Sequence, residues 1–109
     1  MQYLLVYYGG SSGQTEEEQK AIMDDWFAWF GGLGAAVKDG GLPFSGAIKS
    51  VATDGSTSDG PIGEPATGYS ILSADSLDAA TAMAQACPVL KSGGSISVYE
   101  SVDMPAPPT

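Results

Sequence analysis

Two carboxylates are placed where a catalytic acid or base could act. Asp59 lies in a long predicted loop, and Glu100 ends a segment that is otherwise typical of an apolar strand. A carboxyl group whose pKa is raised by burial can take up and return a proton near neutral pH. Each residue also has an ordinary role, because Asp59-Gly60-Pro61 suits a turn and Glu100 suits a solvated strand end. Both interpretations stay open at the level of sequence.

Four tyrosines could contribute phenol groups to a binding site. They lie on segments that the sequence predicts as neighbouring strands: Tyr3, Tyr7, Tyr69 and Tyr99. A phenol offers a hydrogen bond beside a large apolar surface, a combination that small-molecule pockets commonly use. The same four rings could instead be core aromatics at an interface between two copies of the chain. The two roles are compatible.

The absence of histidine excludes several kinds of site. Without imidazole there is no Ser-His-Asp or Cys-His arrangement, and the commonest metal ligand is missing. Cys87 is the only cysteine, and it shares a predicted helix face with Leu77, Ala80 and Ala84. We therefore expect a buried, slowly reacting thiol rather than a nucleophile. No phosphate-binding or dinucleotide fingerprint occurs, and we expect neither a metal nor a cofactor.

Length and charge limit the remaining classes. The chain of 109 residues is long enough for one domain with one core, and its apolar fraction of 43% is typical of a globular protein. A formal net charge of −9 repels nucleic acids and anionic membranes, so we expect neither as a partner. Residues 1–8 predict a strand rather than a signal peptide. With no run long enough to span a membrane, a cytoplasmic location is expected.

Apolar periodicity and capping residues predict four strands and two helices. The predicted strands are 3–8, about 45–52, 67–72 and 95–101, and the predicted helices are about 16–38 and 77–87. Thr15 with Glu18 forms a capping box at the start of the first helix, and Asp75 with Asp78 resembles one before the second. Glycines 31, 32 and 34 inside the first helix indicate a close backbone approach, a kink or an early end.

The order β-α-β-β-α-β predicts an α+β protein with a ferredoxin-like fold. Such a fold has an antiparallel four-stranded sheet with both helices on one face. Residues 53–65 are rich in Gly, Ser, Thr, Asp and Pro and predict a long loop between the second and third strands. We expect a single domain over residues 1–103, followed by a proline-rich tail at 104–109.

The first predicted strand has bulky side chains on both of its faces. Tyr3, Leu5 and Tyr7 alternate with Leu4, Val6 and Tyr8. A strand with one face in water usually shows polar residues on that face. Two helices can cover only one face of a small sheet, so the other face needs a partner. We therefore expect a homodimer in which two sheets face each other.

Several segments together resemble the YCII-related family, which includes the so-called DGPF domain. The opening strand 3–7 is similar to the family's first strand, and Asp59-Gly60-Pro61 matches the first three letters of the DGPF signature, with Ile62 where the family has phenylalanine. Gly68-Tyr69, the Ala-rich segment that ends in Cys87-Pro88, and residues 94–100 resemble the second half. The resemblance implies a dimeric α/β barrel. The His-Asp pair associated with the family has no counterpart here, because the chain lacks histidine.

Two functions of different classes follow as hypotheses. The first is a homodimeric small-molecule-binding protein with an aromatic cleft lined by its sheet and no histidine-based catalysis. The alternative is a metal-independent enzyme of isomerase or lyase type that uses Asp59 or Glu100 with tyrosine donors. The enzyme needs a carboxylate buried in a pocket, whereas the binding protein needs only the pocket. The sequence favours the first, because it offers no base better placed than these two carboxylates.

Overall fold

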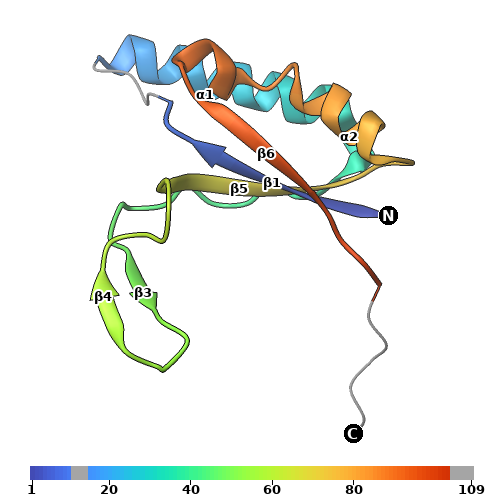
Figure 1. Ribbon diagram of the computed structural model, residues 1–109. Coiled ribbons are helices and arrows are strands. Elements are labelled where there is room, and N and C mark those ends of the chain that lie inside the picture. The colour runs from blue at the N-terminus through green and yellow to red at the C-terminus, as the bar shows by residue number, and fades with distance from the viewer. Residues whose placement is uncertain (11–14, 104–109) are drawn as a thin grey trace, which may run out of the picture.

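The computed structural model describes residues 1–10 and 15–103, which form an α+β arrangement of two helices and six strands (Figure 1). The elements are β1 (Gln2–Tyr8), α1 (Glu16–Leu33), the 3₁₀ turn η1 (Gly34–Ala36), β2 (Val37–Asp39), β3 (Lys49–Val51), β4 (Thr57–Asp59), β5 (Ala66–Ser73), α2 (Leu77–Ala84), the 3₁₀ turn η2 (Pro88–Ser92) and β6 (Ser95–Glu100). The predicted tail 104–109 and part of the loop expected before the first helix lie outside the described residues.

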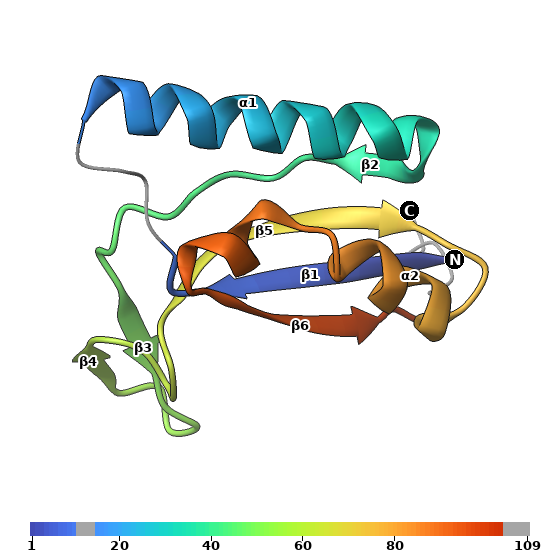
Figure 2. The same ribbon diagram turned by 90° about the horizontal axis from the view of Figure 1, so that it is seen from above.

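The strands form two separate sheets. Four of them make an antiparallel sheet in the order β2-β5-β1-β6, and β3 pairs only with β4 in a two-stranded ribbon. Both helices and η2 lie over one face of the four-stranded sheet, with α1 along its β2 side and α2 along its β6 side (Figure 2). The described helices leave the opposite face bare. The predicted α+β class, with both helices on one face, is confirmed at this level.

Helix ends follow local capping chemistry. Thr15 caps α1 as predicted, because its hydroxyl accepts a hydrogen bond from the Glu18 amide at 3.1 Å. Three glutamates, at positions 16–18, occupy the first turn, where the helix dipole favours negative charge. In α2 the cap comes from the predicted segment 73–76 and is Ser76, whose hydroxyl accepts from the Ala79 amide at 3.0 Å, so the Asp75–Asp78 capping box does not form.

The second strand of the main sheet is not where the sequence predicts it. The prediction placed it at 45–52, whereas β2 is Val37–Asp39, inside the span predicted as the end of the first helix. The helix stops at Leu33 because Gly34 adopts a φ of 57°, a conformation that a helix cannot continue. Gly31 and Gly32 have open space where a Cβ would lie. The glycine cluster therefore marks an early helix end and not a close backbone approach.

The predicted loop at 53–65 contains a strand, so that prediction is wrong over residues 57–59. Lys49–Val51 is indeed a strand, but its partner is Thr57–Asp59, and the two form a hairpin outside the main sheet. The Asp54 carboxylate accepts hydrogen bonds from the amide and the hydroxyl of Ser56, at 2.9 Å and 2.7 Å. This turn folds the chain back on itself, a local effect that polar composition alone does not distinguish from a loop.

The core lies between the helices and the covered face of the main sheet. Its buried members come from the strands and from the segments above them: Leu5, Tyr7, Trp29, Leu72, Ala84, Cys87 and Val89. The Trp29 indole donates a hydrogen bond to the Met83 carbonyl at 3.1 Å, which joins α1 to α2. The rings of Tyr7 and Trp26 meet edge to face, with centroids 5.2 Å apart. Both tryptophans of α1 therefore pack into the core above the sheet.

Candidate functional site

The described helices leave one face of the four-stranded sheet uncovered, and its side chains are mostly apolar. The strand registers align its side chains in rows across β5, β1 and β6. The large side chains on this open face, as we call it, are Leu4, Val6, Tyr8, Tyr69, Ile71 and Tyr99. The same registers add Ser95 and Ser97 of β6, and no residue of these three strands on the open face is charged. Such a surface is suited to an apolar partner or ligand.

A carboxylate and a phenol meet at the β2 edge of the open face. The Tyr69 hydroxyl donates a hydrogen bond to Asp39 Oδ2 at 3.3 Å, and the Gly41 amide donates to Asp39 Oδ1 at 2.8 Å. Phe44 stacks on Tyr69, with ring centroids 6.1 Å apart and an interplanar angle of 29°. Since both Asp39 oxygens and one face of the Tyr69 ring are occupied, the two functional groups are held in a defined orientation.

The glycine turn after β2 makes this arrangement possible. Gly41 has a φ of 79°, which residues with a side chain rarely adopt. A Cβ at this position would also collide with the Tyr69 carbonyl. The Phe44 amide donates to the Thr67 carbonyl at 2.9 Å, so the segment stays against β5 as far as Phe44. Asp39 and Phe44 were not singled out from the sequence, because they lie between the predicted first helix and the predicted second strand.

The four predicted tyrosines divide between the two faces of the sheet. Tyr69 and Tyr99 lie on the open face, whereas Tyr3 and Tyr7 are buried on the covered face. The Tyr7 hydroxyl donates to Ser70 Oγ at 2.7 Å, and the Ser70 hydroxyl donates to the Gly40 carbonyl at 2.8 Å. These phenols therefore do not line one surface together. Ligand binding by these four tyrosines remains a prediction.

Burial changes the acidity of the covered tyrosines. Loss of solvent raises the pKa of Tyr7, and this effect outweighs the hydrogen bond with Ser70, which acts in the opposite direction. The pKa of Tyr3 is also raised, first by burial and then by the neighbouring Glu100 carboxylate. Both phenols are kept protonated, so they serve as hydrogen-bond donors inside the domain.

The two predicted carboxylates lie away from the open face. Glu100 is opposite Tyr3 in the sheet register, and its carboxylate accepts a hydrogen bond from the Tyr3 hydroxyl at 3.3 Å. Asp59 is on the β3–β4 ribbon, where its side chain is 89% exposed and lies 2.9 Å from the Lys49 ammonium group. Neither residue is enclosed in a cavity, and their proposed catalytic roles remain predictions.

The single cysteine is deeply buried, as the sequence predicts. Cys87 is 2% exposed and belongs to the core beneath η2. Burial raises the pKa of its thiol to about 11, although hydrogen bonds with the Val89 backbone and with Tyr7 partly oppose this change. The thiolate is therefore disfavoured near neutral pH. Slow reaction with thiol reagents remains the expected behaviour.

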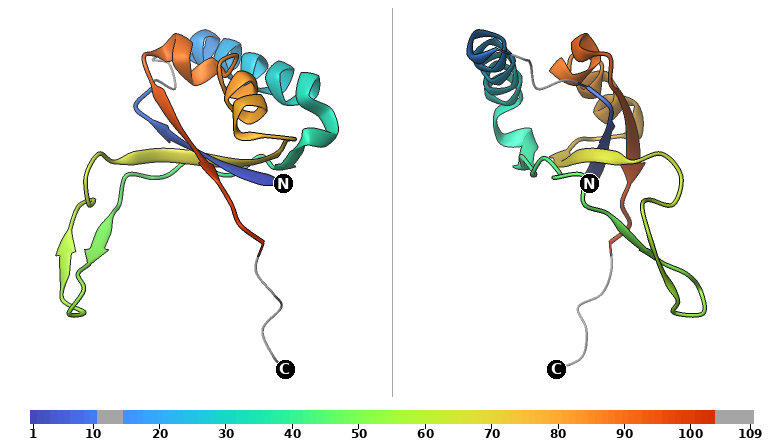
Figure 3. Two further views of the ribbon diagram at one scale, coloured as in Figure 1. Left: turned by 45° about the vertical axis from the view of Figure 1, so that its right-hand side comes forward. Right: turned by 90° about the vertical axis from the view of Figure 1, so that its left-hand side faces the viewer.

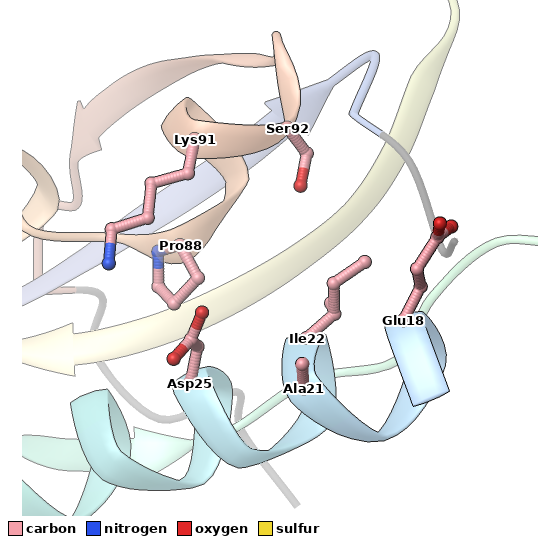
Figure 4. A pocket seen from close by; sticks show the side chains of 7 residues that line it. All are labelled: Glu18, Ala21, Ile22, Asp25, Pro88, Lys91 and Ser92. Carbon is pink, nitrogen blue, oxygen red and sulfur yellow. The ribbon is translucent and has the colours of Figure 1, made fainter. Parts of the chain in front are cut away.

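A shallow groove runs between α1 and η2, on the helix side of the domain (Figure 4). It comprises two adjoining hollows of about 370 Å³ and 420 Å³, which share Asp25, Pro88 and Lys91 in their walls. Figure 4 shows Asp25 on α1 and Lys91 on η2, with Pro88 near both, and Ile22 further along the groove. Most lining side chains are exposed. The sequence singled out none of these residues as a site.

The described part of the chain contains neither a cluster of metal ligands nor a membrane-spanning helix. Within residues 1–10 and 15–103, no three His, Cys, Asp or Glu side chains gather closely enough to hold a metal ion. In the same residues, no helix is both long enough and apolar enough to cross a bilayer. Binding of a metal or cofactor is thus not assigned to any described cluster.

Comparison with known proteins does not extend this assignment. A scan against models of protein families finds no match, and a search of curated proteins finds no similar sequence. The functional interpretation therefore depends on the geometry of the open face and of its Asp39–Tyr69 edge.

Proposed function

We propose that this protein is a homodimeric small-molecule-binding protein in which the open faces of two sheets enclose an aromatic cleft. The proposal keeps the assembly that the resemblance to the YCII-related family implies, a ferredoxin-like chain paired into a dimeric α/β barrel. The order β2-β5-β1-β6, with the β3–β4 ribbon as an addition outside the sheet, supports this assembly. So does the position of both helices on the same face.

The single observation that supports the proposal most is the uncovered apolar face. Val6 and Tyr69 are adjacent on it and only half-buried, and Tyr99 is 54% exposed. A monomer rarely leaves a contiguous apolar surface of this kind in water. A covered aromatic side chain removes about 150–250 Å² from solvent, and a stable pair buries about 800 Å² per partner.

A second copy suits this face better than a charged partner does. The strands β1, β5 and β6 place no charged side chain on it, so the net charge of −9 is carried elsewhere on each copy. Two such faces can approach with their repelling charges at the periphery, where salt screens them. The dimer is therefore expected to keep or gain stability as the salt concentration rises.

The cleft is expected above β6. Packed sheets lie about 10 Å apart when their side chains interdigitate fully. Ser95 and Ser97 place small side chains on the open face beside the larger residues of β1. Two sheets that pack closely over β1 and β5 would therefore leave space over β6. With Tyr8 and Tyr99 as aromatic walls, and no charged side chain of β1, β5 or β6 on this face, the space suits an uncharged apolar molecule.

The enzyme alternative is favoured by one specific observation. Asp39 and Tyr69 bring a carboxylate and a phenol within hydrogen-bond distance, and the exposed Asp39 gains the burial that such chemistry requires only when a second copy covers the open face. A carboxylate can accept a proton from a bound molecule while a phenol donates a hydrogen bond to it. The variant Asp39→Asn separates the two functions, since it leaves binding by a binding protein within about twofold and abolishes turnover by an enzyme.

Light scattering at micromolar concentration tests the dimer. Wild-type protein is expected to have the mass of two chains, and Tyr99→Asp that of one, because a buried carboxylate without a partner is strongly unfavourable. The matched control is Phe27→Asp, which places the same charge on an exposed aromatic position of α1, on the helix side. A monomeric wild type with a native circular dichroism spectrum, or equal dissociation by both variants, would contradict the homodimer.

Binding of Nile red, an uncharged aromatic dye, tests the cleft. Its fluorescence is expected to rise with wild-type protein and with Phe27→Asp, and to stay low with Tyr99→Asp. Tyr8→Ala should weaken binding without dissociating the dimer, because Tyr8 is opposite Ser95 at the edge of the cleft. A wild-type dimer that does not bind the dye would overturn the cleft and leave the dimer in place.

A further inference from the structure

The β3–β4 ribbon stands apart from the rest of the domain. We call residues 45–65 the arm. Its two strands pair with each other and with no strand of the main sheet. Figure 1 and Figure 3 show the arm extending away from the helices, on the side of the sheet that carries the open face. A molecule placed against the open face would therefore meet the arm as well.

The arm has little to stabilise it within its own chain. Every arm residue is exposed except Ile48, Ser50 and Gly60, which are only half-buried. Its internal support consists of hydrogen bonds such as that from the Ala52 amide to the Ser56 carbonyl at 2.7 Å, and of one exposed ion pair between Lys49 and Asp59. An ion pair this exposed contributes little to stability. An isolated two-stranded hairpin is marginally stable in water, so this ribbon needs cover from outside.

One face of the ribbon is suited to an apolar contact. The register places Lys49, Val51, Thr57 and Asp59 on one face and Ser50 and Ser58 on the other. The Lys49–Asp59 ion pair neutralises the charges next to Val51. Val51 is 62% exposed, and Ile62, in the segment that returns to β5, is 81% exposed. These two apolar side chains stand in water in the single chain without an evident structural role.

We propose that the arm is a dimer clasp, which packs Val51 and Ile62 against the second copy of the chain beside the paired open faces. This inference rests on the proposed homodimer and adds the contact that orders the arm. In a two-fold symmetric pair each arm contacts the other copy, so every apolar contact of the arm occurs twice in the dimer. The second copy is favoured over another protein because the arm extends to the side of the sheet that carries the open face, where the proposed partner copy lies.

Substitution on the two faces of the ribbon tests the clasp. Val51→Asp and Ile62→Asp are each expected to raise the dimer dissociation constant by about tenfold or more, as loss of a buried apolar contact does, when measured by sedimentation equilibrium. The matched control is Ser58→Asp, which adds the same charge on the opposite face and should change the constant by less than about twofold. All three positions are exposed in the single chain, so the variants are expected to fold.

Hydrogen exchange gives a second readout that does not depend on substitution. The amides of Ala52 and Gly60 are hydrogen-bonded inside the arm. Their protection should fall when wild-type protein is diluted below its dissociation constant, while amides of the central strand β1 stay protected. Protection of the arm that is independent of concentration would show that the arm is ordered by itself, and would overturn the clasp.

The outcomes separate the clasp from the proposed function. If both arm variants leave the dissociation constant unchanged while Tyr99→Asp dissociates the pair, the clasp is wrong and the homodimer stands. An equal effect of Ser58→Asp would also overturn the clasp, because the effect would then come from charge alone. A monomeric wild type would overturn the homodimer itself.

Discussion

The two faces of the four-stranded sheet are built from the same strands, yet they differ in what covers them. On the covered face, Leu5 and Tyr7 are buried beneath the helices. On the open face, Leu4 and Val6 occupy the alternate positions of the same strand and are only partly buried. Since both sets of side chains are bulky and apolar, the difference arises from the elements above them and not from the strand.

Tyrosine shows what this difference means for function. The phenol of Tyr7 donates to Ser70 inside the domain, whose hydroxyl in turn donates to the chain that follows β2. The phenol of Tyr69 donates to Asp39, an exposed carboxylate at the sheet edge. The first group joins two segments of the fold, and the second is accessible to another molecule. Tyrosine therefore stabilises the fold on the covered face and can contact another molecule on the open face.

The largest expected effect compares neighbouring leucines of β1. Leu5→Ala should lower the free energy of unfolding by about 2–5 kcal/mol, because Leu5 is fully buried and its truncation leaves a cavity. Leu4→Ala should cost less in dilute, monomeric protein and more at concentrations that favour the dimer. Urea denaturation at two protein concentrations measures both. Equal losses at the two positions, independent of concentration, would contradict the distinction between the faces.

The next effect is a loss of stability at alkaline pH, which depends on the covered face. Folding raises the pKa of Cys87 from its ordinary value of 9.0 to about 11, so the folded state favours the protonated thiol. The corresponding stability is complete below pH 9.0 and is lost as the pH rises toward about 11. The raised pKa of Tyr7 acts in the same direction at still higher pH.

Denaturant midpoints between about pH 8 and pH 11 measure this loss. Cys87→Ala removes the thiol and should make the decline above pH 9.0 shallower, although the variant is less stable at neutral pH. Tyr69→Phe, on the open face, serves as the control and should keep the wild-type profile. An unchanged profile in Cys87→Ala would show that burial of the thiol does not control the alkaline limb.

The smallest expected effect compares two phenols. Tyr7→Phe should destabilise the protein by about 1 kcal/mol, because it removes the donor to Ser70 from a buried site. Tyr69→Phe should cost less than about 0.5 kcal/mol, since the hydrogen bond to Asp39 is long and exposed to water. Thermal denaturation of the two variants tests the order. A larger loss at Tyr69 would indicate that the open face is more deeply buried in solution than in the single chain.

Local patterns determined much of this fold. The alternation in β1 correctly predicted which side chains share a face, and Thr15 with Glu18 predicted the start of α1. In the second half of the chain, β5 and β6 follow the predicted boundaries closely. The second helix ends at Ala84 rather than at the predicted Cys87, which instead precedes the 3₁₀ turn η2 and is buried there. These features depend on residues only a few positions apart, where side-chain spacing and capping hydrogen bonds act directly on the backbone. A single sequence contains that information in full.

Long-range contacts decided the remainder, including the candidate site. The strand β2 has three residues, too few for a periodic pattern, and it exists because Val37 pairs with Leu72 and Gly40 accepts from Ser70. That pairing brings Asp39 to Tyr69, a residue 30 positions away, while the predicted Asp59 and Glu100 lie elsewhere. Local composition does not predict a strand at Asp39, because the strand with which it pairs, β5, lies far away in the sequence. Only tertiary pairing places this carboxylate beside a phenol, and only the packing of helices determines which face of the sheet is left open.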